Sequence, residues 1–389
     1  MTETILKPGW KRVRISDCCD QISDRVDNPS KSGFERFVGL EHMQTREISI
    51  REWGSTEEVT SAMKLFKAGD VLVARRNVYL ERAARAAFDG VCSGDAIVLR
   101  HKNIPCLHGL LPFILNTDEF WGYANSQADG SMSKRLSVAR LMDYEFALPP
   151  LEEQRKIVLL LESLTKADEL SKMSLSKLET VLRSFILKEY ELAISNFPKL
   201  RVDKVGSITM GRQKAPKYRK GINPHPFLKV ANIGDLELKI DKLEEMDFSQ
   251  REVEKYRLEP GDILLTEGDL ISQFKVGRPA IYEGQIEDCC FQNTLIRFRP
   301  GPNLNPYYGV ILFEGARLMG ELAKVANTTT VTHLGLGRFS TVKIPIPPSN
   351  IQQMAVDKYI QILSVRGKLR ERIKNSIELK TRNINEALG

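Results

Sequence analysis

An internal repeat constrains this chain more than any other feature of its sequence. Gly69-Asp70-Val71-Leu72 returns as Gly261-Asp262-Ile263-Leu264, and Leu148-Pro149-Pro150 returns as Ile346-Pro347-Pro348. The two copies lie about half of the 389-residue chain apart, whereas solenoid repeats recur roughly every 20 to 50 residues. We therefore predict that a whole domain has been duplicated.

Each copy is predicted to have the same mixed plan, which places the chain in the α+β class. Short β-branched runs at 70–74, 95–100, 261–266 and 294–298 are separated by glycine and proline, as is typical of strands joined by turns. A Pro-Pro step then leads into a long stretch with helical periodicity. We expect two similar mixed α/β domains, at 1–148 and 196–346, each followed by a long helix, at 149–195 and 347–389.

Both long helices are expected to carry an apolar stripe. The first begins after Pro149-Pro150, where Glu152 and Glu153 suit the positive end of a helix dipole. Apolar residues then recur at steps of three and four, interrupted by Asp168 and Ser171. The first stripe comprises Ile157, Leu161, Leu164, Leu175, Leu178, Leu182 and Phe185, and the second comprises Ile362, Val365, Leu369, Ile373, Ile377 and Ile384.

Neither helix can bury such a stripe alone, and the sequence leaves two arrangements open. In one, each helix packs on its own globular region. In the other, the two helices pair as an antiparallel coiled coil, which relates the two domains by a pseudo-twofold axis. At 1.5 Å per residue, roughly 40 residues make a rod of about 60 Å, so paired helices would act as a spacer.

The most specific motif is the run Leu148-Pro149-Pro150-Leu151-Glu152-Glu153-Gln154-Arg155-Lys156-Ile157. Its weaker counterpart is Ile346-Pro347-Pro348-Ser349-Asn350-Ile351-Gln352-Gln353. Together with the Gly-Asp-[Val/Ile]-Leu element of each copy, these runs resemble the specificity subunit of Type I restriction-modification enzymes over essentially the whole chain. The second copy departs from the pattern, because Ser349-Asn350 replaces the acidic pair after its prolines.

The resemblance implies that each variable region is a target-recognition domain for one half of a split, asymmetric DNA sequence. It also implies that the helices act as a spacer and as a docking surface for two methyltransferase subunits, to which two restriction and motor subunits can be added. The chain itself is expected to catalyse nothing, so that S-adenosylmethionine, ATP and Mg would bind to the partner subunits.

Catalytic motifs are missing or incomplete. The sequence has no G-x-x-x-x-G-K-[ST] loop for a nucleotide. Asn305-Pro306-Tyr307-Tyr308 is similar to the Asn-Pro-Pro-Tyr of amino-methyltransferases but lacks one proline, and we interpret it as a turn that opens a helix at 307–325. The five histidines and six cysteines form no zinc motif. We therefore expect no metal site, and six reduced, mostly buried thiols.

Two other classes of function stay open from the residues alone. One is a stand-alone degenerate DNA methyltransferase or nuclease, and the other is a coiled-coil adaptor without a DNA role. Asp235-Leu236-Glu237-Leu238-Lys239 contains the Glu-x-Lys of metal-dependent nucleases but has no Pro-Asp partner upstream. The longest aliphatic run, at 157–161, is far shorter than the roughly 18 residues that cross a bilayer. We expect a cytoplasmic protein without membrane contact.

A formal net charge of +7 favours a polyanionic partner, here double-stranded DNA. Base reading needs paired donors or acceptors and phosphate binding needs cations, so we expect basic and polar loops at strand ends. The repeat predicts two such loops at equivalent places in each copy. The candidates are Arg75, Arg76, Asn77, Tyr79, Arg82, Lys134 and Arg135 in the first copy, and Arg212, Lys214, Lys217, Arg219, Lys220, Gln273, Lys275, Thr328, Thr329 and His333 in the second.

Overall fold

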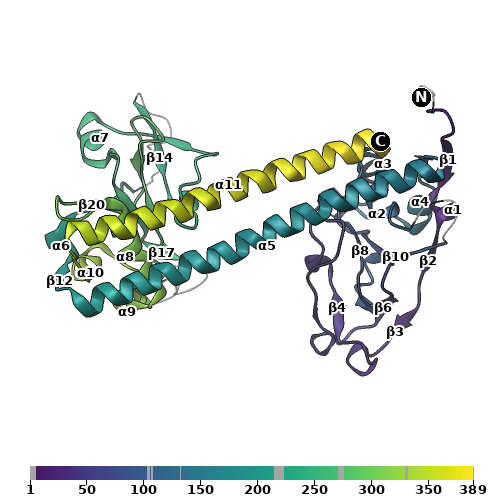
Figure 1. The fold of residues 1–389 in the computed structure, drawn as a ribbon, viewed down its shortest axis with the longest axis horizontal. Coiled ribbons are helices and arrows are strands. Elements are labelled where there is room, and N and C mark those ends of the chain that lie inside the picture. The colour runs from purple at the N-terminus through teal and green to yellow at the C-terminus, as the bar shows by residue number, and fades with distance from the viewer. Residues whose placement is uncertain are drawn as a thin grey trace. The chain divides into compact units, whose positions relative to one another are not determined.

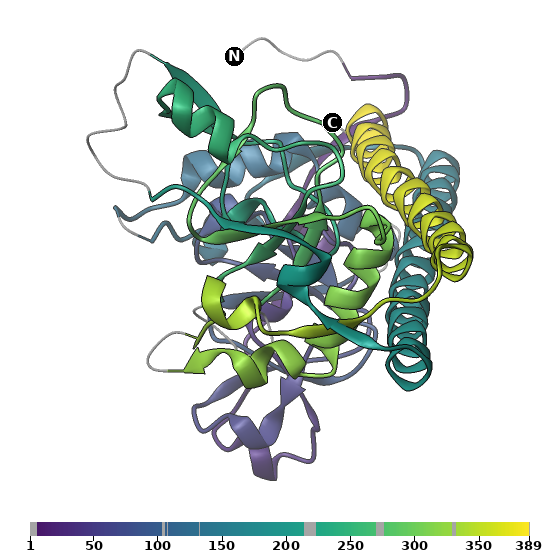
Figure 2. The same ribbon diagram turned by 90° about the vertical axis from the view of Figure 1, so that its left-hand side faces the viewer.

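The computed structural model describes residues 6–102, 106, 108–131, 133–213, 223–269, 276–328 and 332–388. The chain divides into two compact units, one formed by residues 1–173 with 369–389 and the other by residues 174–368. The long helices α5 (Leu151–Asn196) and α11 (Ser349–Leu388) contribute to both units (Figures 1 and 2). Each unit has its own hydrophobic core.

In the first unit, both ends of the globular region meet in one antiparallel ladder, in which β1 (Lys11–Arg14) pairs with β11 (Glu145–Leu148). The central sheet has the order β2-β10-β7-β8, and a second sheet has the order β3-β6-β9-β4-β5. The strands are β2 Cys19–Ile22, β3 Arg25–Val26, β4 Arg36–Val38, β5 Gly54–Ser55, β6 Met63–Phe66, β7 Val71–Ala74, β8 Ala83–Arg85, β9 Gly90–Cys92 and β10 Ala96–His101.

The central sheet of the first unit is covered on both faces, because side chains alternate along a strand. Val71 and Val73 belong to a core shared with the helices, whereas Leu72 and Ala74 face a core shared with the second sheet. The helices of this unit are α1 Ile15–Cys18, α2 Leu111–Ile114, α3 Asp118–Gln127 and α4 Val138–Met142, with single 3-10 turns η1 Pro29–Lys31, η2 Leu40–His42, η3 Thr56–Glu58 and η4 Val78–Leu80.

The second unit repeats this plan. β12 (Lys199–Arg201) pairs with β23 (Lys343–Pro345), and the central sheet β13-β20-β16-β18 has the same order as its counterpart. Two smaller sheets have the orders β15-β14-β19 and β17-β22-β21. The strands are β13 Gly206–Met210, β14 Pro224–Leu228, β15 Glu244–Asp247, β16 Ile263–Thr266, β17 Gly268–Asp269, β18 Pro279–Ile281, β19 Cys290–Phe291, β20 Leu295–Pro300, β21 Asn327–Thr328 and β22 Thr332–His333.

The helices of the second unit are α6 Val202–Val205, α7 Gln250–Tyr256, α8 Pro306–Leu318, α9 Glu321–Val325 and α10 Leu336–Phe339, with a 3-10 turn η6 Val230–Asn232. The four predicted strand runs coincide with β7, β10, β16 and β20. Their matching order in the two central sheets confirms the duplicated α+β fold.

The repeated Gly-Asp step closes the turn before the central strand in both copies. Gly69 and Gly261 have φ of +94° and +95°, a left-handed conformation that favours glycine. The following Asp70 is 3% exposed and accepts two hydrogen bonds from Arg100, at 2.9 and 2.6 Å. Asp262 and Arg299 form the equivalent pair, at 2.7 and 2.9 Å. A carboxylate at this turn therefore ties two neighbouring strands together.

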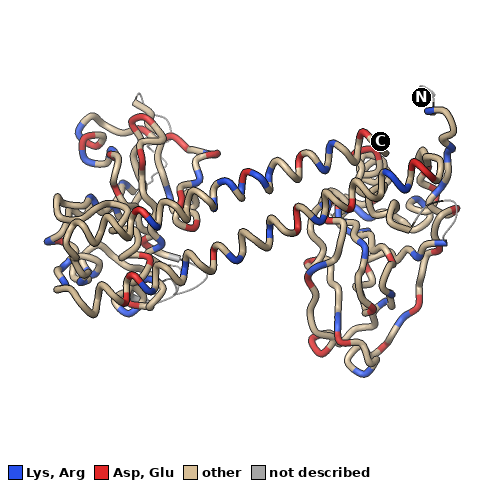
Figure 3. The backbone as a smooth tube through the Cα atoms, viewed as in Figure 1, with Lys and Arg blue, Asp and Glu red and all other residues tan. Residues whose placement is uncertain are grey.

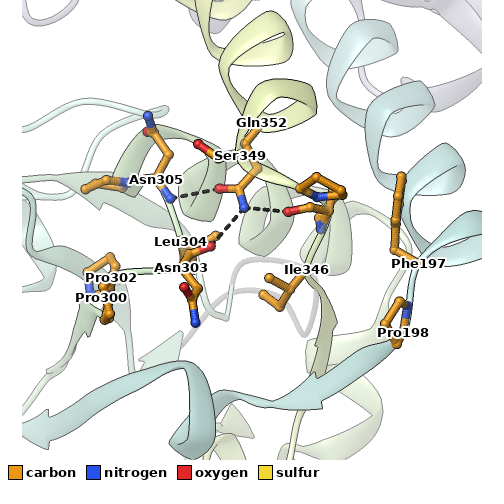
Figure 4. A pocket seen from close by; sticks show the side chains of 14 residues that line it. Phe197, Pro198, Pro300, Pro302, Asn303, Leu304, Asn305, Ile346, Ser349 and Gln352 are labelled. Carbon is orange, nitrogen blue, oxygen red and sulfur yellow. Dashed lines mark hydrogen bonds between the residues drawn. The ribbon is translucent and has the colours of Figure 1, made fainter.

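A buried glutamine explains the repeated Pro-Pro motif. The Gln154 side chain, at the start of α5, donates to the Pro149 carbonyl at 2.8 Å. Gln352, at the start of α11, donates in the same way to the Pro347 carbonyl at 2.8 Å, and also to the Asn303 carbonyl at 2.9 Å. Figure 4 shows Gln352 at the centre of this network, beside a pocket of the second unit. Each glutamine thus fixes the angle at which its long helix leaves the domain.

The two long helices run antiparallel to each other within each unit. In the first unit, Ile157 and Leu161 of α5 share a core with Ile384 and Leu388 of α11. In the second unit, the far end of α5 packs against the start of α11, where Tyr190 and Tyr359 share a core. Both of the arrangements left open by the sequence are therefore present in part, because the helices pack on each other and on the globular regions.

The predicted apolar stripes are correct for α5 and partly wrong for α11. Leu161 and Leu182 are 0% and 3% exposed, and the predicted polar break is real, because Asp168 is 0% exposed. On α11, however, Val365 and Ile377 are 47% and 41% exposed. The sequence period placed these two side chains in the stripe, but charged residues occupy buried positions nearby: Arg366 and Lys380 are 4% and 5% exposed.

Three further expectations can be compared with the structure. The helix expected at 307–325 is two helices, α8 and α9, because Gly320 has a left-handed φ of +72° between them. All six cysteines are buried and free of disulfides, as expected. Among the described residues, no helix combines the length and the apolar character that crossing a membrane requires.

Candidate nucleic-acid interface

In the first unit, the structure brings together the two loops that the sequence singled out. The Leu136 amide donates to the Arg75 carbonyl at 2.9 Å, and the Asn77 amide donates to the Lys134 carbonyl at 2.9 Å. Arg76 Nε donates to Ser133 Oγ at 3.0 Å. The segment after β7 and the hairpin that precedes α4 therefore form one continuous site, which we call the reading loops.

A carboxylate lies among the cations of these loops. Asp95, directly before β10, has an oxygen 3.7 Å from Arg76 Nη1 and 3.5 Å from Arg135 Nη2. The two arginine side chains are 48% and 49% exposed, whereas Asp95 is 26% exposed. Exposed guanidinium groups above a half-buried carboxylate suit contact with phosphate or base edges.

Lys64 and Asp95 are neighbours of this site that sequence reasoning missed. Lys64 on β6 is 6% exposed, and its Nζ donates to the Ala96 carbonyl at 2.6 Å. Burial lowers the pKa of Lys64, and the positive charges of Arg75 and Arg25 lower it further. The sequence carries no local signal that β6, with Lys64, lies beside these loops.

The other candidates of the first copy differ in exposure. Tyr79 is 62% exposed. Arg82 is partly buried and donates through Nη1 to the Leu40 carbonyl at 2.6 Å, and burial lowers its pKa. The Arg82 backbone carbonyl accepts a hydrogen bond from the Ala74 amide at the end of β7. In the second unit, the Arg278 carbonyl accepts in the same way from the Thr266 amide at the end of β16. Arg278 is therefore the structural counterpart of Arg82. Arg278 is not among the candidates predicted from the sequence.

The second unit has reading loops at the equivalent place. The Leu334 amide donates to the Glu267 carbonyl at 2.8 Å, which matches the bond between Leu136 and Arg75. A hairpin pairs Asn327 with His333, as Asp129 pairs with Arg135 in the first unit. His333 Nδ1 lies 2.8 Å from a Glu267 oxygen, and these side chains are 50% and 16% exposed.

The remaining candidates of the second copy are partly outside the described residues, namely Lys214, Lys217, Arg219, Lys220, Gln273, Lys275 and Thr329. Thr328 ends β21 of the hairpin. Arg212 is placed differently from the expectation of an exposed loop cation. It is 6% exposed, its Nε lies 3.0 Å from Glu252 and its guanidinium stacks 4.9 Å from the Phe248 ring. Arg212 is thus committed to contacts inside the protein.

The long helices present a second kind of surface. Large apolar side chains point outward on both, including Leu159 at 71%, Leu170 at 56% and Met354 at 61% exposed. Lys and Arg alternate with Asp and Glu along the same helices (Figure 3). Exposed apolar groups of this size on helices are typical of contact with another protein. The apolar period of the sequence predicted the inward stripe and missed this outward one.

The motifs considered for catalysis have structural explanations. Asn305 caps α8, since its side chain accepts from the Tyr307 amide at 2.9 Å, as interpreted from the sequence. In the Glu-x-Lys run, Glu237 lies 3.9 Å from Arg366 of α11. In the described part of the chain, no group of three or more His, Cys, Asp or Glu side chains is placed to hold a metal ion.

Comparison with known proteins defines the class of this protein. The family model of the Type I restriction modification DNA specificity domain matches residues 8–180 and again residues 200–379. The chain therefore belongs to this family and carries its domain twice. This confirms the resemblance to Type I specificity subunits that the Pro-Pro motif indicated.

Two relatives match parts of the chain. A provisionally assigned type I restriction enzyme specificity subunit, MjaX of Methanocaldococcus jannaschii, is 32% identical over 35% of this chain. The EcoDI specificity subunit of Escherichia coli is 28% identical over 47% of this chain. The matches span only 32% and 41% of the lengths of these two relatives.

Solved structures match the fold over nearly the whole chain. A chain reported under complex assembly and conformational transition of a type I R-M system has a TM-score of 0.60 at 21% identity, covering 99% of this chain and 98% of its own. The S subunit of a Type I restriction-modification system from M. genitalium has a TM-score of 0.58 at 11% identity, covering 98% and 96%. At these identities, the likeness concerns the fold.

Proposed function

We propose that this chain is the subunit that gives a Type I restriction-modification complex its DNA sequence specificity, and that it recognises a two-part, asymmetric target. In this proposal, residues 1–148 and 196–346 are two target-recognition domains, each reading one half of the target. The observation that carries the proposal is the reading-loop site, which occurs at the same place in both copies of a domain from this family.

The proposed division of labour follows from side-chain chemistry. Arginine can donate two hydrogen bonds to a guanine edge, which discriminates by about 1 to 3 kcal/mol per contact. Lysine binds phosphate as a point charge and adds affinity without reading sequence. We assign base reading to the exposed Arg76, Arg135 and His333, and backbone contact to Lys134 together with the basic residues at 214–220.

The helices at 149–195 and 347–389 are proposed to be the spacer and the docking surface for two methyltransferase subunits and for two restriction and motor subunits. The outward apolar side chains of α5 and α11 support this role. S-adenosylmethionine, ATP and Mg would bind to those partners, and the chain itself would contribute recognition alone. The complex would work in the cytoplasm, on the DNA of the cell.

Deletion of the gene in the source cells, followed by methylome sequencing, tests this function. We expect adenine methylation to vanish at one two-part motif and to return when the wild-type chain is re-expressed. Re-expression of the Arg76→Ala/Arg135→Ala variant should restore little methylation. The exposed pair Arg14→Ala/Glu145→Ala on β1 and β11, outside the reading loops and the long helices, is the control and should restore it fully. An unchanged methylome after deletion would contradict the proposal.

A further inference from the structure

We propose that Asp95 and Glu267 are positioning residues, which orient the side chains of Arg135 and His333 for sequence reading. Neither carboxylate is expected to touch DNA. The inference rests on the proposed function, because it assigns a role within the reading loops. It starts from an arrangement that is present in both domains although the residues that build it differ.

In the first domain, Arg135 is the last residue of the hairpin in the reading loops, and its Nη2 lies 3.5 Å from Asp95. Asp95 is itself held in place: its amide donates to Ser93 Oγ at 3.2 Å, and its carbonyl accepts from the Arg75 amide at 2.9 Å. The carboxylate is attached to a fixed backbone directly before β10. It therefore favours one orientation of the flexible Arg135 side chain.

In the second domain, His333 ends the hairpin at the place of Arg135, and Glu267 lies 2.8 Å from its Nδ1. Glu267 is fixed in the same manner, since its amide donates to the Thr294 carbonyl at 2.9 Å. Glu267 occupies the place of Arg75, and Thr294 occupies the place of Asp95. The carboxylate therefore comes from different strands in the two copies, since Asp95 precedes β10 and Glu267 follows β16. Its contact with the last hairpin residue is the same in both.

This exchange separates the arrangement from simple inheritance of a residue. An ion pair kept for stability alone would be of little use at this exposed place, because exposed ion pairs add little to folding stability. A carboxylate near the DNA backbone also opposes binding, since it repels phosphates. It is useful at this place if it reduces the freedom of the reading side chain, because ordering a long side chain on binding costs affinity.

Removal of the carboxylate charge is therefore expected to change two affinities in opposite directions. Binding to DNA of unrelated sequence should become roughly two- to threefold tighter, because one repulsive charge is lost. Discrimination at one half of the target should fall roughly fivefold or more, because the reading side chain loses its orientation. A residue with a merely structural role would weaken both affinities together.

The experiment uses the full chain assembled with its methyltransferase subunits, at one fixed salt concentration. Dissociation constants are measured for four duplexes: the target mapped in the source cells, the target with its first half scrambled, the target with its second half scrambled, and a duplex of unrelated sequence. Asp95→Asn should lose discrimination at one half only, and Glu267→Gln at the other half only. In an Arg76→Gln/Arg135→Gln background, Asp95→Asn should have no further effect on discrimination, because both side chains that its carboxylate contacts are then absent.

Glu119→Gln is the matched control, since it removes one negative charge from an exposed residue in the first turn of α3. It should leave discrimination unchanged at both halves. Equal loss of both affinities in Asp95→Asn, or unaltered discrimination in both carboxylate variants, would overturn the positioning role. Failure of the proposed function itself has a different signature, because the wild-type assembly would then bind all four duplexes equally.

Discussion

At the residue scale, some equivalent positions of the two domains hold the same residue, whereas others differ in charge. Asp70 and Asp262 are one identical pair, and each accepts hydrogen bonds from an equivalent arginine. The hydrogen bonds inside the protein therefore explain why both copies keep this aspartate. Arg82 and Arg278 are also identical, yet in the described structure the Nε of each has no hydrogen-bond partner. Both domains would meet the same phosphate backbone but different bases, so a shared arginine suits phosphate and a differing residue suits bases.

We therefore predict that Arg82→Gln and Arg278→Gln weaken binding to all duplexes alike. Each substitution should reduce the slope of log affinity against log salt by about 1, because one phosphate contact is lost. The measurement is titration of the assembled complex with target and unrelated duplexes between low and physiological salt. A change of the methylated motif in either variant, with an unchanged salt slope, would instead mean that the arginine reads bases.

Buried thiols should make the folding stability of the protein fall at alkaline pH. Burial raises the pKa of Cys92 and of Cys290 from 9.0 to about 12. The thiols stay protonated in the folded chain where an unfolded chain loses its protons. Their contribution to stability is thus complete below pH 9 and is lost as pH rises toward 12, at up to about 1.4 kcal/mol per pH unit and thiol.

Urea unfolding at pH 8 and at pH 10.5 checks this pH dependence. Wild-type stability should fall between the two values, and the Cys92→Ala/Cys290→Ala variant should fall less. Both proteins also contain buried tyrosines, so the comparison is made between the two proteins rather than from one profile alone. Equal losses in the two proteins would contradict the role assigned to the thiols.

How far the sequence predicts single residues depends on where their partners lie in the chain. Arg76 and Arg135 were identified because each belongs to a polar loop next to a strand. Arg212 was placed in an exposed basic run, but its partners Glu252 and Phe248 come from a distant segment and bury it. Asp95 and Glu267 gave no repeat signal at all, because the contact recurs from different strands.

At the element scale, the long helices are where local pattern and tertiary structure agree best. Their starts were predicted within a few residues, because proline fixes the first turn and a buried glutamine secures it. Their buried charges were predicted only in part. Asp168 of α5 lies 3.1 Å from Lys172 and 3.9 Å from Lys380 of α11. A pattern of apolar residues does not predict that Lys380 is buried opposite Asp168.

Lengthening both helices should change the gap between the two halves of the target. We predict that four residues inserted after Met173 and four inserted after Lys368, where the two units divide, add about 6 Å to each helix. This corresponds to about two base pairs at 3.4 Å each. Methylome sequencing should then show the same half-site sequences with a longer gap.

The matched control inserts four residues into α5 alone. The insertion shifts one helix against the other by a turn, so that buried contacts between α5 and α11 are lost, and the control variant should lose thermal stability as well as methylation. Changed half-site sequences with an unchanged gap in the double insertion would refute the role of the helices as a spacer.

At the scale of the whole molecule, each globular region begins and ends at a single strand pair. β1 and β11 join Lys11 to Leu148, and β12 and β23 join Lys199 to Pro345. A region whose two ends meet at one ladder can be exchanged without moving the helices that it connects. The duplication therefore makes the globular regions separable from the long helices.

We predict that a chain with residues 12–147 in place of 199–345 reads the same half-site twice. The pseudo-twofold axis expected from the repeated sequence would make the resulting motif a palindrome. The first domain contacts α5 through Arg85 with Glu162, Arg51 with Glu169 and Glu47 with Lys172. By the repeat, the corresponding residues of α11 are Ile360, Gly367 and Arg370.

Two substitutions on α11, Ile360→Glu and Gly367→Glu, supply the carboxylates that Arg85 and Arg51 would otherwise lose, while Arg370 already replaces the cation of Lys172. The exchanged chain with these substitutions should methylate the palindrome in source cells that lack the wild-type gene. The exchanged chain without them is the control and should methylate the same motif less completely, because its transplanted domain is held more weakly. Persistence of the original asymmetric motif would show that sequence reading does not reside in the exchanged regions.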